Sequence, residues 1–332
     1  MSVSTERNKS IRTIIYGAGA IGGVVGSHLA LAGKEVILIG RPNHINTIRK
    51  QGLRFITPTD THTLRLPAVT KPSQIDFRRE DVVLLCVKGQ NTDEALRNLR
   101  TVVGDIPIFC FQNGVRNEEI AIRHFPRVYG VTVRVGGVFV KNGEVVARSD
   151  PPGYLIMGVY PVGTDDLVDA VATNLRDAGF YVLVTSDVMS YKWGKLMFNL
   201  NNTIEAITNM RGGDNNRILK AAQQEAQEIL SKAGIHWISA EELALQWPEI
   251  SVQPRSSLDT EAQGSTWQSL ARQQGTVEAA FLNGEIIRLA ERLGAQASIN
   301  ERLLCIVQQM AINDELPGKY TSTELCRLVG LD

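Results

Sequence analysis

The sequence predicts an α/β domain built on a doubly wound parallel sheet, followed by an all-helical domain. Strand and helix patterns alternate through the first half of the chain, a glycine-rich turn follows the first strand, and strand patterns disappear after Ser186. With 332 residues, the chain is long enough to form two hydrophobic cores. We therefore predict one domain over residues 1–186 and a second over residues 187–332.

Composition limits the classes of ligand and the compartment. The 35 Lys and Arg side chains balance 35 Asp and Glu side chains, so we expect no attraction to nucleic acid or to an anionic membrane surface. The four cysteines lie far apart, which argues against a zinc site or a redox dithiol. No apolar stretch is long enough to span a bilayer, and the N-terminus lacks the core of a signal peptide. A cytoplasmic protein that binds a small molecule is the expectation.

Short apolar runs and helical periodicities give the expected elements of the first domain. The runs of strand length are Ile11–Tyr16, Glu35–Ile39, Val82–Val87, Ile106–Phe111 and Tyr181–Val184. The helical segments run from Ala20 to about Gly33, over Asn91–Val103, and from a Thr164 cap to about Ala178. A strong hairpin signal, Asn142-Gly143, separates Val138–Val140 from Val145–Ala147. We expect an antiparallel element there to close the domain.

The second domain is expected to be mostly helical. Its predicted helices are Val188–Thr208, Asn215–Lys232, Ala240–Leu245, Gln274–Leu293 and Glu301–Ile312. The segment Ser251–Ser257, which contains Pro254, is expected to be a surface connection.

A glycine-rich turn, Gly17-Ala18-Gly19-Ala20-Ile21-Gly22, follows the first strand and opens the first helix. This G-x-G-x-x-G spacing in a strand-turn-helix context predicts a dinucleotide site. Gly17 permits the tight turn, Gly19 lets the backbone approach a pyrophosphate, and Gly22 lets helix and strand pack closely. The helix N-terminus then faces the phosphate charge. The first domain is therefore predicted to be of the Rossmann type.

Residues after three further strands extend this cofactor site. The second strand ends in Ile39-Gly40-Arg41, with no acid to hold a ribose 2′-hydroxyl, so Arg41 is a candidate ligand for the 2′-phosphate of NADPH. A solvated surface arginine is the alternative. Lys88 and Asn113 follow two later strands, and open α/β sheets bind ligands at such carboxyl ends.

A polar stripe lies on one face of an otherwise apolar helical segment in the second domain. At about 100° per residue, Lys195, Asn199 and Asn202 leave the helix within a narrow arc. Such a stripe is either solvent-exposed surface or the wall of a site. Because the glycine turn predicts a nucleotide domain, we expect the stripe to line a cleft between the two domains.

Six motifs follow one another along the chain: Gly17–Gly22, Arg41, Val87-Lys88, Gln112-Asn113-Gly114, Lys195-Leu196-x-x-Asn199 and Glu278-x-x-x-x-Asn283-Gly284. In this combination the chain resembles the ketopantoate reductase (2-dehydropantoate 2-reductase) family over nearly its whole length. The resemblance implies NADPH-dependent reduction of a 2-oxo acid, with 2-dehydropantoate to pantoate, a step of pantothenate and coenzyme A biosynthesis, as the leading reaction. It also implies a helical domain related to that of 6-phosphogluconate dehydrogenase.

The resemblance assigns catalytic roles to Lys195, as general acid, and to Glu278, which hydrogen-bonds in the closed complex. The first role is chemically sound, because hydride addition to a carbonyl leaves negative charge on oxygen, which an ammonium can stabilise and protonate. A solvated helix residue is the alternative for Glu278. The five histidines lie outside the motifs, so a histidine-based mechanism is disfavoured.

The resemblance also implies ligand residues. Lys88 and Asn113 would lie beside the nicotinamide and the substrate. The substrate ligands are Asn113 and Asn199, together with a hydroxyl from Ser265 or Thr266 for the substrate carboxylate.

Two departures from the family pattern concern the substrate. The family's second asparagine falls at Thr203 in this chain, whereas Asn202 lies one position earlier and, by helical geometry, closer to the Lys195 stripe. Both residues stay candidates. The family's acidic residue after its serine pair is missing from Ser265–Leu270, where Trp267 adds bulk. A different 2-oxo acid therefore stays open as the substrate.

Two other functions stay open. One is a related NADP-linked 2-hydroxy acid or opine-type dehydrogenase, and the other is a non-catalytic NADPH-binding protein, against which Lys195 and Glu278 argue. No metal, nucleic acid or membrane partner is expected. The sequence leaves the oligomeric state open, and a homodimer is one alternative.

Overall fold

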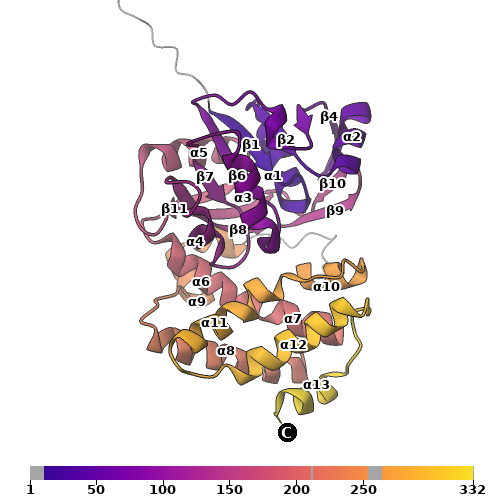
Figure 1. The fold of residues 1–332 in the computed structure, drawn as a ribbon, viewed down its shortest axis with the longest axis vertical. Helices are drawn as coiled ribbons and strands as arrows, with labels where there is room; N and C mark the ends of the chain where they lie inside the picture. The colour runs from indigo at the N-terminus through magenta and orange to yellow at the C-terminus, as the bar shows by residue number, and fades with distance from the viewer. Residues whose placement is uncertain (1–10, 211, 253–263, 332) are drawn as a thin grey trace, which may run out of the picture. The chain divides into compact units, whose positions relative to one another are not determined.

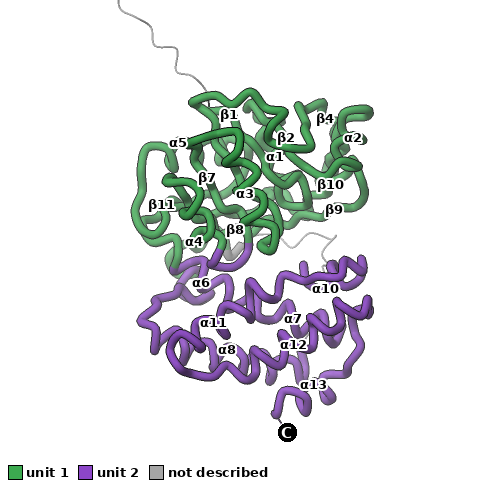
Figure 2. Tube along the Cα trace, viewed as in Figure 1, with its two compact units in different colours: residues 1–112, 117–189, 244–259 green, residues 113–116, 190–243, 260–332 purple. Residues whose placement is uncertain are grey.

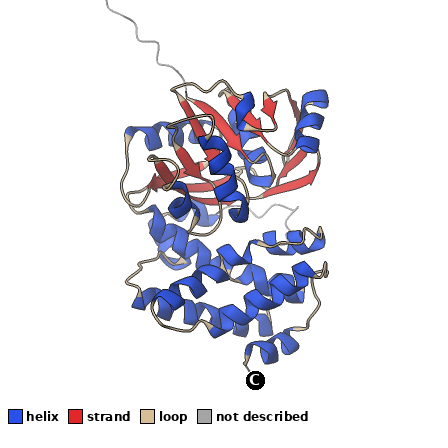
Figure 3. Cartoon of the chain, in the orientation of Figure 1, coloured by secondary structure: helices blue, strands red, loops and turns tan. Residues whose placement is uncertain are grey.

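The computed structural model describes residues 11–210, 212–252 and 264–331 (Figure 1). The chain divides into two compact units. Unit 1 comprises residues 1–112, 117–189 and 244–259, and unit 2 comprises residues 113–116, 190–243 and 260–332 (Figure 2). The described strands all belong to unit 1, and unit 2 is helical (Figure 3). The predicted combination of an α/β part and a helical part is confirmed, while the functional assignment of residues 1–186 and 187–332 stays a prediction.

The main sheet of unit 1 has eight strands in the order β12-β11-β8-β7-β6-β1-β2-β5. Its strands are β1 (Arg12–Tyr16), β2 (Val36–Ile39), β5 (Ala68–Val69), β6 (Asp81–Leu85), β7 (Ile108–Cys110), β8 (Val128–Val135), β11 (Gly153–Val159) and β12 (Tyr181–Val184). Neighbours are parallel except for the pair β8 and β11. Because Tyr16 pairs with Leu85 and Leu85 with Cys110, the carboxyl ends of β1, β6 and β7 meet at one edge.

The five strands that the apolar runs predict are present as β1, β2, β6, β7 and β12. The sequence patterns do not single out β8 and β11, although both are interior strands of the sheet. Both strands are buried along almost their whole length, so they lack the alternation of a half-buried strand. Gly130 in β8 and Gly158 in β11 further weaken the strand signal.

The predicted hairpin is present but does not close the main sheet. Strands β9 (Gly137–Lys141) and β10 (Glu144–Ala147) are antiparallel, and Gly143 between them has a φ of 76°. They belong to a separate four-stranded sheet in the order β4-β3-β10-β9, with β3 (Leu53–Ile56) and β4 (Thr61–Leu64). Since β10 pairs in parallel with β3, its partner comes from a distant part of the sequence. In the main sheet β11 pairs antiparallel with β8, and β12 runs parallel to β11. The predicted antiparallel hairpin is therefore confirmed, but it belongs to the second sheet.

Helix α1 (Ala20–Leu31) packs between the two sheets. A methyl group added at Gly23 would lie 2.8 Å from Val145 of β10, and one at Gly26 would lie 3.1 Å from Ile15 and Leu38 of the main sheet. Unit 1 also contains η1 (Pro72–Gln74), α2 (Pro42–Gln51), η2 (Gly89–Asn91), α3 (Thr92–Arg100), α4 (Asn117–Ala121) and α5 (Asp166–Asp177). The predicted cap of α5 was wrong, because the side chain of Asp165, rather than Thr164, accepts a hydrogen bond from the Val168 amide at 2.8 Å.

The remaining helices are α6 (Val188–Asn199), α7 (Asn201–Thr208), α8 (Asp214–Lys232), α9 (Ala240–Gln246), η3 (Pro248–Val252), α10 (Ser265–Ala271), η5 (Glu278–Phe281), α11 (Asn283–Arg292), α12 (Ser298–Ile312) and α13 (Ser322–Val329). The core of unit 2 gathers around α7, α8 and α12, with Ile204, Ile218 and Leu303 fully buried. Among the described helices, none has both the length and the apolar composition that crossing a bilayer requires.

Two of the predicted helices are interrupted. The expected helix Val188–Thr208 breaks at Leu200, although this residue keeps a φ of −57° and a ψ of −27° and its amide still bonds to Leu196 at 3.1 Å. The expected helix Gln274–Leu293 was wrong in its first half, because Leu282, with a φ of −120° and a ψ of −91°, separates η5 from α11. Of the predicted connection Ser251–Ser257, the part after residue 252 lies outside the described residues.

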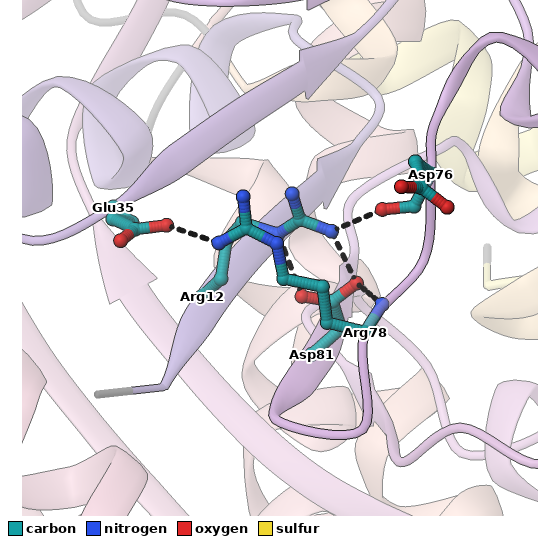
Figure 4. Close-up of polar contacts among 5 residues, drawn as sticks. All are labelled: Arg12, Glu35, Asp76, Arg78 and Asp81. Atoms are coloured by element: carbon teal, nitrogen blue, oxygen red, sulfur yellow. Dashed lines mark hydrogen bonds and ion pairs between the residues drawn. The ribbon is translucent and has the colours of Figure 1, made fainter. Parts of the chain in front are cut away.

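A charged cluster joins the amino ends of β1 and β6, at the edge opposite to the glycine turn (Figure 4). The guanidinium of Arg12 donates to both carboxylate oxygens of Asp81 at 2.7 Å and to the Asp76 carbonyl at 2.7 Å. The Arg78 amide donates to the same carboxylate at 2.7 Å, and the Arg78 side chain pairs with Glu35. The side chains of Arg12 and Asp81 are 8% and 0% exposed, so this ion pair is buried and well hydrogen-bonded.

We expect Arg12→Met to lower the free energy of unfolding by about 3 kcal/mol, because it leaves the Asp81 carboxylate buried without its cation. Urea denaturation of the variant and the parent measures the change. The double variant Arg12→Met/Asp81→Asn is the control, since its second substitution removes the buried charge and keeps an acceptor for the Arg78 amide. A single variant no less stable than the double would contradict this prediction.

Candidate active site

The glycine turn after β1 has a backbone that side chains would disrupt. Gly17 has a φ of 113°, and a methyl group there would lie 2.7 Å from the carbonyl carbon of Cys86. A methyl group at Gly22 would lie 2.7 Å from the Ile15 side chain. The amides of Gly17 and Ala18 both donate to the Ile39 carbonyl at 2.9 Å, which ties the turn to β2. The turn therefore needs glycine at its first and last positions for packing.

Gly19 differs from these two glycines. A methyl group added there would meet no described atom within 4 Å, so the residue faces open space at the N-terminus of α1. No acidic side chain lies in the first turn of α1, and no side chain caps it. The first amides of a helix attract phosphate, and a side chain at position 19 would fill the space beside them. The turn therefore fits a pyrophosphate, with Ala20, Ile21 and Gly22 supplying the first helical amides.

Arg41 lies just beyond the carboxyl end of β2 and precedes the first residue of α2, with an exposed side chain. Three residues later His44 is buried, and its Nδ1 accepts a hydrogen bond from the Gly143 amide at 2.9 Å. Burial lowers the pKa of His44, while the nearby Ala18 carbonyl raises it to a smaller extent. The first turn of α2, which directly follows Arg41, is thus fixed beside the hairpin β9–β10 and the glycine turn.

Lys88 follows β6 as expected, at the same sheet edge as the glycine turn, and Asn113 follows β7 in the sequence. Lys88 is half-buried and precedes the short helix η2. The Gln112 side chain donates to the Val87 carbonyl at 2.9 Å and to the Thr92 hydroxyl at 2.7 Å. These bonds hold the two connections after β6 and β7 together.

Lys195 and Asn113, which the motifs place far apart in sequence, are in contact. The Lys195 ammonium donates to Asn113 Oδ1 at 2.8 Å. Four residues later on α6, Asn199 is 6% exposed, and its Nδ2 has no hydrogen-bond partner among the described residues. Leaving a buried donor unpaired costs about 1–3 kcal/mol, so this amide is suited to a ligand oxygen.

The start of α10 brings two hydroxyls to the same helical unit. Ser265 Oγ and Thr266 Oγ1 are buried and have no partner within the described part of the chain. A methyl group at Gly264, just before them, would lie 3.2 Å from Asn202 Oδ1, so Asn202 of α7 adjoins the start of α10. Asn202 is half-buried. The start of α10 thus offers two unsatisfied hydroxyls next to Asn202.

Thr203 points elsewhere. It is fully buried, and its hydroxyl donates to Asn283 Oδ1 at 2.6 Å, while Asn283 Nδ2 donates to Asn300 Oδ1 at 3.0 Å. The hydroxyl is therefore engaged in a network inside unit 2. Of the two candidates at this step, only Asn202 has a side chain that is partly accessible.

Glu278 is the first residue of η5 rather than part of one helix with Asn283, which opens α11. Its side chain is half-buried. The indole of Trp267 packs against the core of unit 2 and donates to Asn209 Oδ1 at 2.7 Å. Trp267 is thus an element of the helical packing.

Sequence reasoning missed a buried ion pair that lies close to Asn113 in the chain. The Arg116 guanidinium lies 2.5 Å from Glu285 Oε1, and the Glu285 side chain is 0% exposed. Arg116 and Glu285 are so far apart in the sequence that no periodicity or motif spacing predicts their contact. Only the fold shows this ion pair. Within the described ranges, no group of three side chains is arranged to hold a metal ion.

Comparisons with known proteins cover both halves of the chain. Residues 13–161 match the family described as "Ketopantoate reductase PanE/ApbA", and residues 187–311 match "Ketopantoate reductase PanE/ApbA C terminal". A 2-dehydropantoate 2-reductase of Pyrococcus horikoshii is 33% identical over 306 residues, which are 90% of this chain and 97% of that protein. One of Archaeoglobus fulgidus is 28% identical over 305 residues, with the same two coverages of 90% and 97%.

Solved structures agree in fold. The crystal structure of a PanE/ApbA family ketopantoate reductase from Ralstonia eutropha has a TM-score of 0.78 at 27% identity, over 92% of this chain and 99% of that one. The ternary structure of D-mandelate dehydrogenase with NADH and anilino(oxo)acetate has a TM-score of 0.79 at 19% identity, over 92% and 100%, and at this identity shows the fold alone. The matches in sequence and structure show that the chain belongs to the ketopantoate reductase PanE/ApbA family of nicotinamide-linked oxidoreductases.

Proposed function

We propose that the chain reduces a 2-oxo acid to a 2-hydroxy acid with NADPH, and that 2-dehydropantoate is its substrate and pantoate its product. The relatives at 28% and 33% identity carry the name 2-dehydropantoate 2-reductase. The observation that carries the proposal is the hydrogen bond of 2.8 Å between the Lys195 ammonium and Asn113 Oδ1. Both residues belong to unit 2, and the bond fixes the orientation of a proton donor on the segment that follows β7 in the sequence.

The proposed chemistry needs a group that donates a proton to the carbonyl oxygen. When bound, the nicotinamide supplies the hydride that reduces the carbonyl carbon. Reduction breaks the carbonyl π bond and leaves its electron pair on oxygen. Lys195 stabilises this charge and donates its proton there, so that the product is a hydroxyl and the lysine becomes a neutral amine. Asn113 orients the ammonium by accepting one of its other hydrogens.

The unsatisfied polar atoms of unit 2 are suited to the rest of the substrate. Asn199 Nδ2 and the hydroxyls of Ser265 and Thr266 are buried donors that a carboxylate or hydroxyl oxygen would satisfy. Asn202 adjoins the start of α10 and completes this set. We assign Glu278 a hydrogen bond to the substrate and keep Thr203, bound to Asn283, as a supporting residue. In this proposal residues 1–186 bind the nucleotide and residues 187–332 supply the general acid.

NADPH is the proposed nicotinamide cofactor because of Arg41. An exposed guanidinium at the end of β2, where NAD-binding domains place an acid, is suited to a 2′-phosphate. We expect Arg41→Ala to raise the KM for NADPH by roughly tenfold or more, since a charge-assisted hydrogen bond to phosphate is lost. The KM for NADH should stay the same. Initial rates with each cofactor measure both values, and an equal change in the two would contradict the 2′-phosphate assignment.

Steady-state assays with NADPH and a panel of 2-oxo acids test the reaction. Oxidation of NADPH that depends on 2-dehydropantoate, at a higher kcat/KM than for other acids, is the expected result. Activity on another acid alone would overturn the substrate and point to a related 2-hydroxy acid or opine-type dehydrogenase. Binding of NADPH without turnover on any acid would overturn the reductase and identify a cofactor-binding protein.

A further inference from the structure

The segment Asn113–Arg116 is fixed by contacts that the proposed chemistry does not use. Gly114 has a φ of 83°, and a methyl group there would lie 2.5 Å from the Phe281 carbonyl oxygen, so the backbone of this segment packs directly on the end of η5. The Arg116 guanidinium carbon lies 5.0 Å from the centroid of the Phe281 ring. The segment Asn113–Arg116 therefore packs against η5, the short helix that begins with Glu278.

An ion pair anchors the far end of this segment. Arg116 Nη2 lies 2.5 Å from Glu285 Oε1, and the Arg116 side chain is only 27% exposed. The contact is an attraction between charges, since Oε1 is not aligned with a hydrogen-bond donor among the described residues. In a buried setting such an attraction is stronger than at the surface and is poorly screened by salt.

The same carboxylate is held from its other side. Arg288 donates to Glu285 Oε2 from Nε at 3.1 Å and from Nη2 at 3.0 Å. Arg288 follows Glu285 by three residues on α11, so this bond is local to the helix. Glu285 is thus a buried anion with two cationic partners, of which only Arg116 belongs to the segment with Asn113.

We propose that Arg116 is a positioning residue for the general acid, because its ion pair with Glu285 holds the segment Asn113–Arg116 so that Asn113 Oδ1 receives the Lys195 ammonium. The inference rests on the proposed function, in which Lys195 is the proton donor. Asn113 lies at one end of the segment and Arg116 at the other, and Gly114 lets the backbone between them sit against Phe281. Losing the ion pair removes the anchor at the Arg116 end of the segment and loosens the orientation of the ammonium, and catalysis depends on that orientation.

The test compares two arginines that share one carboxylate. Arg116→Met keeps an unbranched apolar side chain over Phe281 and removes the charge. We expect kcat to fall roughly tenfold, the size of a weakened hydrogen bond between the Lys195 ammonium and Asn113, with the KM for NADPH unchanged. Arg288→Met is the matched control, because it removes the other partner of Glu285, with a similar loss of thermal stability, but leaves the segment anchored. Its kcat should stay that of the parent.

Two further variants keep the test decisive if Arg116→Met folds poorly. Arg116→Lys retains the charge and should recover most of kcat, whereas Glu285→Gln removes the anion and should lower kcat as Arg116→Met does. Equal kcat losses in Arg116→Met and Arg288→Met would overturn the inference, because they would show a general effect of weakening the Glu285 site. Parental kcat in both Arg116→Met and Glu285→Gln would also overturn it.

Failure of this inference differs from failure of the proposed function. If Lys195→Ala retains turnover, the general acid is misassigned whatever Arg116 does. If Lys195→Ala is inactive while Arg116→Met behaves as Arg288→Met, the general acid stands and only the positioning role is refuted.

Discussion

Replacing Lys195 by Ala is expected to lower kcat by about 100-fold or more, with cofactor binding unchanged. General acid catalysis accelerates a reaction by a factor of about 10²–10⁴. The proposed acid is the Lys195 ammonium, which donates to Asn113 Oδ1 at 2.8 Å. Without the ammonium, the charge that develops on the carbonyl oxygen is neither stabilised nor protonated. Single-turnover rates with saturating NADPH and 2-dehydropantoate measure this chemical step directly.

A matched variant separates the loss of the acid from the loss of side-chain bulk. Lys195→Met keeps most of the side-chain length and should be as slow as Lys195→Ala, while titration of either variant with NADPH should give the parental affinity. An added primary amine of small size should restore part of the rate of Lys195→Ala by donating the missing proton. Near-parental turnover in a folded Lys195→Ala variant would remove Lys195 from the mechanism.

Gly19→Val is expected to weaken NADPH binding by about 10–100-fold, the range of a lost hydrogen bond to a charged group. A Cβ atom at this position meets no described atom within 4 Å, so we expect the valine side chain to occupy the space proposed for the pyrophosphate rather than to clash with the protein. The fold should therefore survive. Fluorescence titration with NADPH measures the affinity, and thermal unfolding shows whether the fold is intact.

Gly104→Val is the matched control for this variant. Gly104 is exposed after α3, and the nearest described atom to a methyl group there lies 3.9 Å away, at the end of the Arg100 side chain. The two substitutions thus add the same side chain to positions with room for it. Parental affinity in Gly19→Val would place the pyrophosphate elsewhere, and equal losses in both variants would show that the effect is not local.

Local patterns predict the elements of unit 1 well because each depends on neighbouring residues. The glycine turn, the strands that precede Lys88 and Asn113, and the hairpin at Asn142-Gly143 all appear where the sequence indicates. The sheet that the hairpin joins could not be predicted. The parallel pairing of β10 with β3 brings Val145 opposite Phe55, and no short-range signal links segments so far apart.

The candidate site shows the same limit. The sequence identifies Lys195 and Asn113 through motifs, yet only the fold brings them within hydrogen-bond distance. The ion pair of Arg116 with Glu285 is a contact between two charged residues that in isolation would be expected on the surface. The difference between Asn202 and Thr203 depends on Asn283, which binds the Thr203 hydroxyl inside unit 2. Helical periodicity alone does not contain this contact.

The position of α1 between two sheets has a consequence for the thermodynamics of cofactor binding. Gly23 lets the hairpin strand β10 approach one side of the helix, and Gly26 lets β1 and β2 approach the other. A helix confined on both sides keeps its first turn in one place whether or not a ligand is present. We therefore expect the amides proposed for the pyrophosphate to lose little conformational entropy when the cofactor binds, so that more of the interaction energy is expressed as affinity.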